Sequence, residues 1–334
     1  MPDRYAHLVA AVFDHPWAIL PSKLAAMVSL LELRAAGLTL TEQDIQARIG
    51  GGSRGRGDDL EVTAGGVGIL PVQGVLAQKL TLMKAISGGT STETIGSDFK
   101  TLHDDPKVKA VLLAFDTPGG SCYGLDELAT AIRSRRGSKP IVAAIDSLAA
   151  SGGYWLAAQC DSIAITPGGD AGHIGVITAH DDLTEAVEKL GVKTTLFHAG
   201  PYKTEGHPLQ PLTDEARAAI QHRVDQAYTR FVRAVAAGRG VTEAAVRSGF
   251  GQGRLLSAED SLAAGLVDRI EPIDAVVARL EQTLATKPAR VVGPRAETPP
   301  STDTPQEPAA RATGQDRTKT GDWQYRAELE LLEL

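Results

Sequence analysis

The stretch KPIVAAIDSLAASGGYWLAAQC, residues 139–160, joins two apolar segments through one serine and two glycines. KPIVAAID has the composition of a strand that is buried on both faces, and YWLAAQC has that of a short buried helix. A buried strand that runs directly into a buried helix is typical of proteins in which helices cover a parallel sheet. The stretch therefore predicts an α/β fold.

The same alternation of strands and helices continues on both sides of this stretch, from residue 67 to residue 285. Successive βαβ units of this kind are expected to cross over in the right-handed sense. The expected strands are 67–76 (a strand or tight hairpin), 108–115, 141–146, 162–166 and 193–199, and a final strand ends near residue 270. The expected helices are 125–136, 183–191, 213–240 and 242–250, with one more inside 253–270.

The two ends of the chain differ from this central domain. Residues 1–49 are predicted to be helical, because PSKLAAMVSLLELRAAG (21–37) repeats apolar residues at helical spacing. Residues 50–66 begin with GGGSRGRGDD and are predicted to be a flexible linker. Residues 286–321 are rich in proline, threonine and charge, which predicts a disordered tail, and residues 322–334 could form one short amphipathic helix.

Composition excludes several classes of protein. A net charge of −7 argues against a nucleic-acid-binding protein. Cys122 and Cys160 are too few for a disulfide framework. No apolar run reaches the roughly 18 residues that a membrane span needs, and the N-terminus lacks a secretory signal pattern. We therefore expect a cytoplasmic protein without a membrane anchor. The chain has no P-loop and no metal-ligand spacing, so we expect no metal or cofactor.

Ser151 is the first residue with a chemical interpretation. It stands where the expected strand turns into the expected helix, which is the edge where α/β proteins place ligands. Gly152 and Gly153 leave the N–H groups of the helix start open to a developing oxyanion. The simpler interpretation is that Ser151 is only a helix N-cap, a common role for serine.

FDTPGGS (115–121) is the second feature, and it also follows a buried strand. Gly119 and Gly120 would expose backbone N–H groups at the same edge of the sheet as Gly152. Two such pairs could supply the two donors of an oxyanion hole, whereas one pair alone would be an ordinary turn.

A serine nucleophile requires a base, and two residues are candidates. Lys203 lies in FHAGPYKTEGHPLQP (197–211), after an expected buried strand, where shielding from water would lower its pKa. His173 lies in GGDAGHIGV (168–176) and is the alternative.

Five motifs in order, DTPGG, ASGGYW, GHIGV, GPYKTEGHP and GRLLSAEDSLAAGLVD, resemble the signal-peptide-peptidase-A-like serine peptidases. The resemblance covers residues 67–275 and implies a Clp/crotonase-like fold of stacked ββα/βαβ units. It implies Ser151 as nucleophile, Lys203 as general base, and an oxyanion hole formed by the backbone of Gly119 or Gly120 together with Gly152.

His173 is a departure from the family pattern, because many members have a serine there that hydrogen-bonds the lysine. His173 could support Lys203 or act as the base itself. We favour Lys203, because its own motif is intact.

The N-terminal helical region and the absence of a membrane anchor resemble the phage head-maturation branch of the family. This likeness implies capsid, scaffold or portal proteins as substrates, an enzyme that acts in the host cytoplasm or the prohead, and self-processing. It also implies a homo-oligomer, in which a neighbouring protomer could supply the lysine. The alternatives are a cytoplasmic housekeeping peptidase and a catalytically inert assembly factor; acyl-CoA chemistry of the crotonase type is disfavoured by the intact peptidase motifs.

Overall fold

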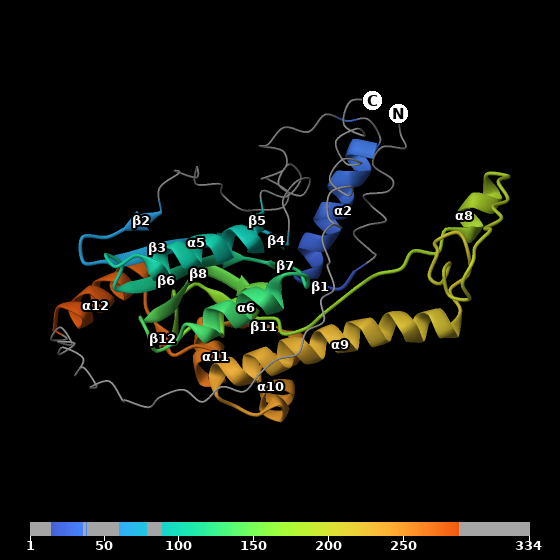
Figure 1. Ribbon diagram of the computed structural model, residues 1–334. Coiled ribbons are helices and arrows are strands. Elements are labelled where there is room, and N and C mark those ends of the chain that lie inside the picture. Colours follow the sequence, from blue (N-terminus) through green and yellow to red (C-terminus); the bar gives the residue numbers. More distant parts are fainter. Residues whose placement is uncertain (1–14, 36–37, 39–59, 79–88, 287–334) are drawn as a thin grey trace, which may run out of the picture. The chain divides into compact units, whose positions relative to one another are not determined.

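The computed structural model describes residues 15–35, 38, 60–78 and 89–286 (Figure 1). The chain divides into two compact units, Met1–Pro288 and Ala289–Leu334, and all the described residues belong to the first. The expected tail and terminal helix lie outside the described residues, as does the linker up to residue 59.

An eight-stranded sheet forms the centre of the first unit. Its main order is β11-β10-β8-β6-β3-β2, with β9 also beside β8 and β12 beside β9. Pairing is parallel throughout except at β2–β3 and β10–β11. The α/β class and the mostly parallel sheet are thus confirmed. The strands are β2 (Glu61–Val62), β3 (Val67–Gln73), β6 (Ala110–Thr117), β8 (Ile141–Ala150), β9 (Ser162–Ile165), β10 (Asp170–Gly172), β11 (Leu255–Ser257) and β12 (Arg269–Ile270).

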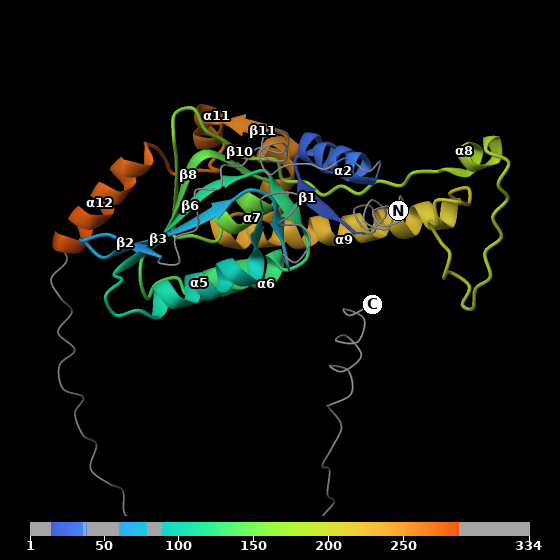
Figure 2. The same ribbon diagram turned by 90° about the horizontal axis from the view of Figure 1, so that it is seen from above.

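Helices cover both faces of this sheet, and the alternation of side chains along β6 shows how. Val111 and Leu113 join a core with α5 (Thr92–Asp104) and α6 (Leu125–Ser134), whereas Leu112 joins a separate core with α12 (Ile273–Thr286). Successive side chains of a strand point to opposite faces, so a continuous apolar run requires cover on both. Figure 2 shows α5 and α6 together on one side of the sheet.

The longest helix, α9 (Asp214–Arg239), matches its prediction closely. The Thr213 hydroxyl accepts a hydrogen bond from the Ala216 N–H at 3.1 Å, and Gly240 ends the helix at φ 67°. Its second half is anchored in the core, where Phe231 stacks on Trp155 with ring centroids 4.6 Å apart. Its first half is largely exposed, so the helix extends beyond the sheet (Figure 1).

Shorter helices complete the C-terminal part of the domain. They are α7 (Gly152–Ala157), α10 (Glu243–Gly249) and α11 (Ala258–Ala263). A forked ion pair between Arg239 and Asp268, at 2.6 and 3.0 Å, ties the end of α9 to the segment before β12. Burial would raise the pKa of Asp268, but hydrogen bonds from Arg239 and from the Ile163 N–H outweigh it and hold that pKa below its usual value.

The N-terminal region contains a strand that the helical prediction missed. β1 (Trp17–Ile19) precedes α2 (Pro21–Ala35) and belongs to a second sheet of order β1-β7-β4-β5. The other strands of that sheet are β4 (Leu76–Ala77), β5 (Thr90–Ser91) and β7 (Gly119–Ser121). The hydrogen-bonding partner of β1 lies about a hundred residues away, so no local pattern reveals the strand. The helix that starts at Pro21 is confirmed.

Three further expectations are corrected. Residues 193–199 form no strand, because every one of them is at least partly exposed and none is paired in a sheet. Residues 67–76 form no hairpin, because β3 and β4 belong to different sheets. The range expected as linker includes β2, which pairs with β3.

The segment between β10 and α9 contains the short helix α8 (Thr184–Lys189). We call residues 179–213 the arm; none of them is buried. Figures 1 and 2 both show α8 beyond the N-terminal end of α9. In the part of the chain that the structure describes, no helix combines the length and the apolar character needed to span a membrane.

Candidate active site

Ser151 lies at the junction of β8 and α7 with a backbone conformation that is unusual for serine. Its φ and ψ are 53° and −114°, and the residue is completely buried. Its N–H donates to the Gly172 carbonyl at 2.7 Å, and its carbonyl accepts from the Trp155 N–H at 2.9 Å. Positive φ in a residue with a side chain is strained, and such strain concentrates at functional sites.

The Ser151 side chain does not cap the helix. Ser151 occupies the N-cap position of α7, but its hydroxyl forms no capping bond there and instead donates to the Gly175 carbonyl at 3.3 Å. The simple N-cap interpretation is therefore wrong.

The two glycines of β7 have different hydrogen-bonding roles. The Gly119 N–H donates to the Thr117 hydroxyl at 3.1 Å, and that hydroxyl donates to the Gly74 carbonyl at 2.6 Å. Gly119 adopts φ 93°, which a side chain would strain. The N–H of Gly120, in contrast, belongs to the edge of β7 that pairs with β1.

The structure brings these glycines close to the start of α7. A Cβ placed on Gly119 would come within 2.8 Å of the Gly152 nitrogen, and one placed on Gly152 within 3.3 Å of the Gly120 nitrogen. Only glycines permit this approach of two backbone segments. The backbone nitrogens of Gly120 and Gly152 therefore lie close together next to Ser151, at the junction of β7 and the start of α7.

His173 reaches the same edge of the sheet from the end of β10. Gly172 pairs with Ala150, so His173 follows β10 as Ser151 follows β8. His173 also has a positive φ, 54°, and its N–H donates to the Arg254 carbonyl at 2.9 Å. Its buried Nδ1 has no hydrogen-bond partner among the described residues. Burial lowers the pKa of the ring, so His173 is neutral at pH 7.

Lys203 is not part of this cluster. It is exposed in the arm, within a turn where its N–H donates to the Gly200 carbonyl at 3.2 Å. The arm ends just before Asp214, the start of α9, and Phe231, which contacts α7, lies about 25 Å farther along the helix axis. One chain thus brings together Ser151, the glycines and His173, while Lys203 stays apart.

Sequence reasoning missed two contributors to the site. Thr117, fully buried, fixes Gly119 through its hydroxyl, and β1 pairs with the edge of β7 opposite β4. The motif DTPGG contains the first without showing its role, and nothing in the sequence near residue 17 indicates the second. The cysteines offer no alternative nucleophile: burial raises the pKa of Cys122 to about 12 and also raises that of Cys160.

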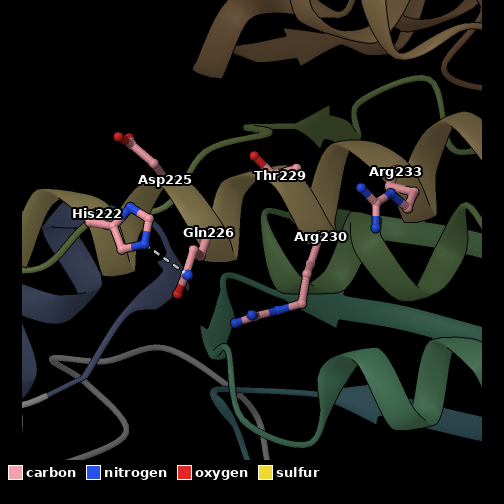
Figure 3. A pocket seen from close by; sticks show the side chains of 6 residues that line it. All are labelled: His222, Asp225, Gln226, Thr229, Arg230 and Arg233. Carbon is pink, nitrogen blue, oxygen red and sulfur yellow. Dashed lines mark hydrogen bonds between the residues drawn. The ribbon is translucent and has the colours of Figure 1, made fainter.

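A surface hollow lies along the exposed side of α9, and Ser151 is not among the residues that line it. It has a volume of about 400 Å³ and is lined by His222, Asp225, Gln226, Thr229, Arg230 and Arg233. Figure 3 shows all six side chains on this one helix, with His222 and Gln226 in hydrogen-bond contact at 2.9 Å. The hollow is open and its walls come from a single helix, so it lacks the converging groups of a small-molecule site.

Comparison with known proteins identifies relatives that are peptidases. The model of peptidase family S49 matches residues 133–287, which include Ser151 and Lys203. Capsid assembly protease C of Escherichia phage lambda is 29% identical over 308 residues, covering 86% of this chain and 68% of that protein. Head-tail preconnector protein GP5 of Enterobacteria phage P21 is 28% identical over 283 residues, covering 81% of this chain and 56% of that protein.

A cellular relative matches less of the chain at higher identity. The putative protease slr0021 of Synechocystis is 32% identical over 192 residues, which cover 58% of this chain and 68% of that protein. The chain thus spans between about half and two thirds of the length of these three relatives. It belongs to peptidase family S49 and is a peptidase.

Proposed function

We propose that the protein is a serine endopeptidase of a phage head, which cleaves scaffold, portal or capsid proteins during maturation in the infected cell. The observation that supports the phage role is the share of this chain that aligns with each relative. The two phage proteins match 86% and 81% of this chain, whereas the Synechocystis protease matches 58%. The phage relatives are named for capsid assembly and for the head–tail connection.

Ser151 is the proposed nucleophile. Its hydroxyl oxygen attacks the carbonyl carbon of the scissile peptide, and the N–H groups of Gly120 and Gly152 donate to the resulting oxyanion. Gly120 is preferred to Gly119, because the Gly119 N–H already bonds Thr117. Collapse of the tetrahedral intermediate breaks the C–N bond and leaves an ester on Ser151, which water then hydrolyses.

Lys203 of a neighbouring protomer is the proposed base. It accepts the Ser151 proton and passes it to the leaving amine. The exposed position of Lys203 in its own chain supports supply from a second copy. The arm also carries apolar side chains that water rarely surrounds in a monomer: Phe197 is 93% exposed, Leu190 78% and Tyr202 70%. Docking on a second copy would bury these side chains and shield the lysine from water.

His173 has a supporting role in this proposal. From the adjacent strand end, the neutral form of its ring can accept a hydrogen bond from the Lys203 amine through Nδ1, which has no partner among the described residues. A His173 that itself acts as base remains the competing mechanism.

Three alanine variants test the assignment: Ser151→Ala, Lys203→Ala and His173→Ala, each co-expressed with the scaffold, portal and capsid proteins of the same genome. Processing should be lost with Ser151→Ala and Lys203→Ala and reduced with His173→Ala. Full processing by Lys203→Ala with none by His173→Ala would make His173 the base. Normal processing by all three would contradict the serine mechanism. Cleavage of a generic unfolded protein but of none of the head proteins would contradict the phage role.

A further inference from the structure

We infer that the edge of β7 occupied by β1 is the substrate-binding edge, and that β1 is a tethered pseudosubstrate bound there with Ala18 at the scissile position. The inference rests on the proposed function, because it says where the substrate of Ser151 binds; we call this edge of β7 the groove. It adds a regulatory element: the N-terminal strand must leave before another protein can be cleaved.

β1 is held on both edges in the manner of an added strand. On one side it pairs antiparallel with β7, in the register Trp17–Ser121, Ala18–Gly120 and Ile19–Gly119. On the other side the Trp17 N–H donates to the Ile177 carbonyl at 2.8 Å, and the Ile177 N–H donates back at 2.9 Å. Extended peptides commonly bind proteins by completing a sheet in this way.

The register places the Ala18 carbonyl at the proposed oxyanion donors. The Leu20 N–H donates to the Pro118 carbonyl at 3.0 Å, and the Cys122 N–H donates to the Pro16 carbonyl at 3.2 Å. Hydrogen-bonded pairs in an antiparallel ladder recur every second residue, so Ala18 and Gly120 form the bonded pair between these two.

The contacts of the Ala18 oxygen agree with this register. A Cβ placed on Gly152 would lie 3.1 Å from the Ala18 oxygen, and one placed on Gly119 would collide with it. The carbonyl of a scissile peptide must occupy this position, between β7 and the start of α7, for Ser151 to attack it.

The side chains of β1 point alternately to two faces, as those of a bound extended substrate would. Ala18 is fully buried in the same core as Ala149 and Leu125, so the position accepts a small residue. Trp17 and Ile19 point to the other face and form a separate cluster with α2 residues, including Met27. α2 thereby holds β1 in place. Because β1 is part of the same chain, it competes with a separate substrate at a high effective concentration.

The first test is the rate at which a fluorophosphonate probe labels Ser151 in the full chain. Ala18→Glu places a charged side chain at a buried position, which should expel β1 and raise the labelling rate on the order of tenfold. Ala25→Glu makes the same change on the exposed side of α2 and should label at the wild-type rate. Equal labelling of wild type and Ala18→Glu would overturn the inference while leaving the nucleophile assignment intact.

A second test measures the groove without catalysis. A fluorescent peptide DHPWAILPS (residues 14–22) should bind the Ala18→Glu protein, as followed by anisotropy, and the same peptide with glutamate at position 18 should not. If neither peptide binds, the groove is not where we place it. Binding without any labelling of Ser151 would instead overturn the proposed function and retain the groove. Should Ala18→Glu fail to fold by circular dichroism, Trp17→Pro replaces it, because it removes the N–H that bonds Ile177.

Discussion

The two halves of the proposed dyad lie in opposite environments. Ser151 is completely buried at the end of β8, a strand with neighbours on both sides, and its own N–H and carbonyl are both hydrogen-bonded. Lys203 is exposed in an arm of which no residue is buried. The fold of one chain therefore places Ser151 in the core, whereas Lys203 lies in the arm, away from Ser151 within the part of the chain that the structure describes.

Under the proposed mechanism, this difference would keep the peptidase inactive until its chains assemble. The core would hold Ser151 and the proposed oxyanion donors in place, and the lysine would arrive only with a second copy. In the inference drawn above, β1 would add a second restraint on the buried half by occupying the edge that a substrate needs. Each prediction below acts on one half and leaves the other unchanged.

The largest effect is expected from Ser151→Ala, which removes the attacking oxygen. It should lower kcat/KM on a peptide substrate by at least ~10⁴-fold, the scale of losing a catalytic serine. Ser147→Ala is the matched control, since Ser147 is exposed on the same strand, and it should keep near-normal turnover. Equal losses of kcat/KM in the two variants would contradict the assignment of Ser151 as the nucleophile.

Gly120→Ala should lower kcat/KM by roughly 10²- to 10³-fold, the cost of losing one oxyanion donor. The added Cβ would collide with the Leu76 carbonyl and push β7 out of position. Gly168→Ala, where no atom lies within 4 Å of the new Cβ, should behave as wild type. Normal kinetics for Gly120→Ala would show that β7 does not supply the donor.

Trp155→Ala and Phe197→Ala compare the two regions through stability. Trp155 is 1% exposed and stacked on Phe231, so its loss should lower the free energy of unfolding by about 3–5 kcal/mol. Phe197 is 93% exposed, so Phe197→Ala should change that energy by less than about 0.5 kcal/mol. It should instead weaken self-association, measured by analytical ultracentrifugation; an unchanged association constant would argue against the arm as an interface.

The smallest effect concerns pH. Burial lowers the pKa of His173 in the folded state, so the unfolded chain takes up a proton more readily as the solution is acidified. The contribution of neutral His173 to the stability of the folded state is complete above the ordinary histidine pKa of about 6.5. It is lost as pH falls toward the lowered pKa of the folded state. Tm should therefore fall between pH 7.5 and pH 5 more steeply for wild type than for His173→Asn, which tolerates positive φ. Parallel curves would contradict this.

The sequence predicted the buried half of the site better than the exposed half. Strands such as β6 and β8 and the caps of α9 are local patterns, and Ser151, Gly120 and Gly152 follow from where those strands end. β1 depends on pairing with residues a hundred positions away, and the strand expected before Lys203 had no neighbour to pair with. A stretch such as TTLF forms a strand only when another strand lies beside it. The residues of the stretch itself do not show whether such a neighbour is present.

Mixing two inactive variants tests most directly whether the two halves come from different chains. Ser151→Ala and Lys203→Ala are each purified, unfolded, mixed in equal amounts and refolded together, and turnover of a peptide substrate is measured. If Lys203 acts on a neighbour, random assembly gives about a quarter of the sites one intact serine and one intact lysine, and activity returns to that fraction. A mixture as inactive as its separate components would contradict the account.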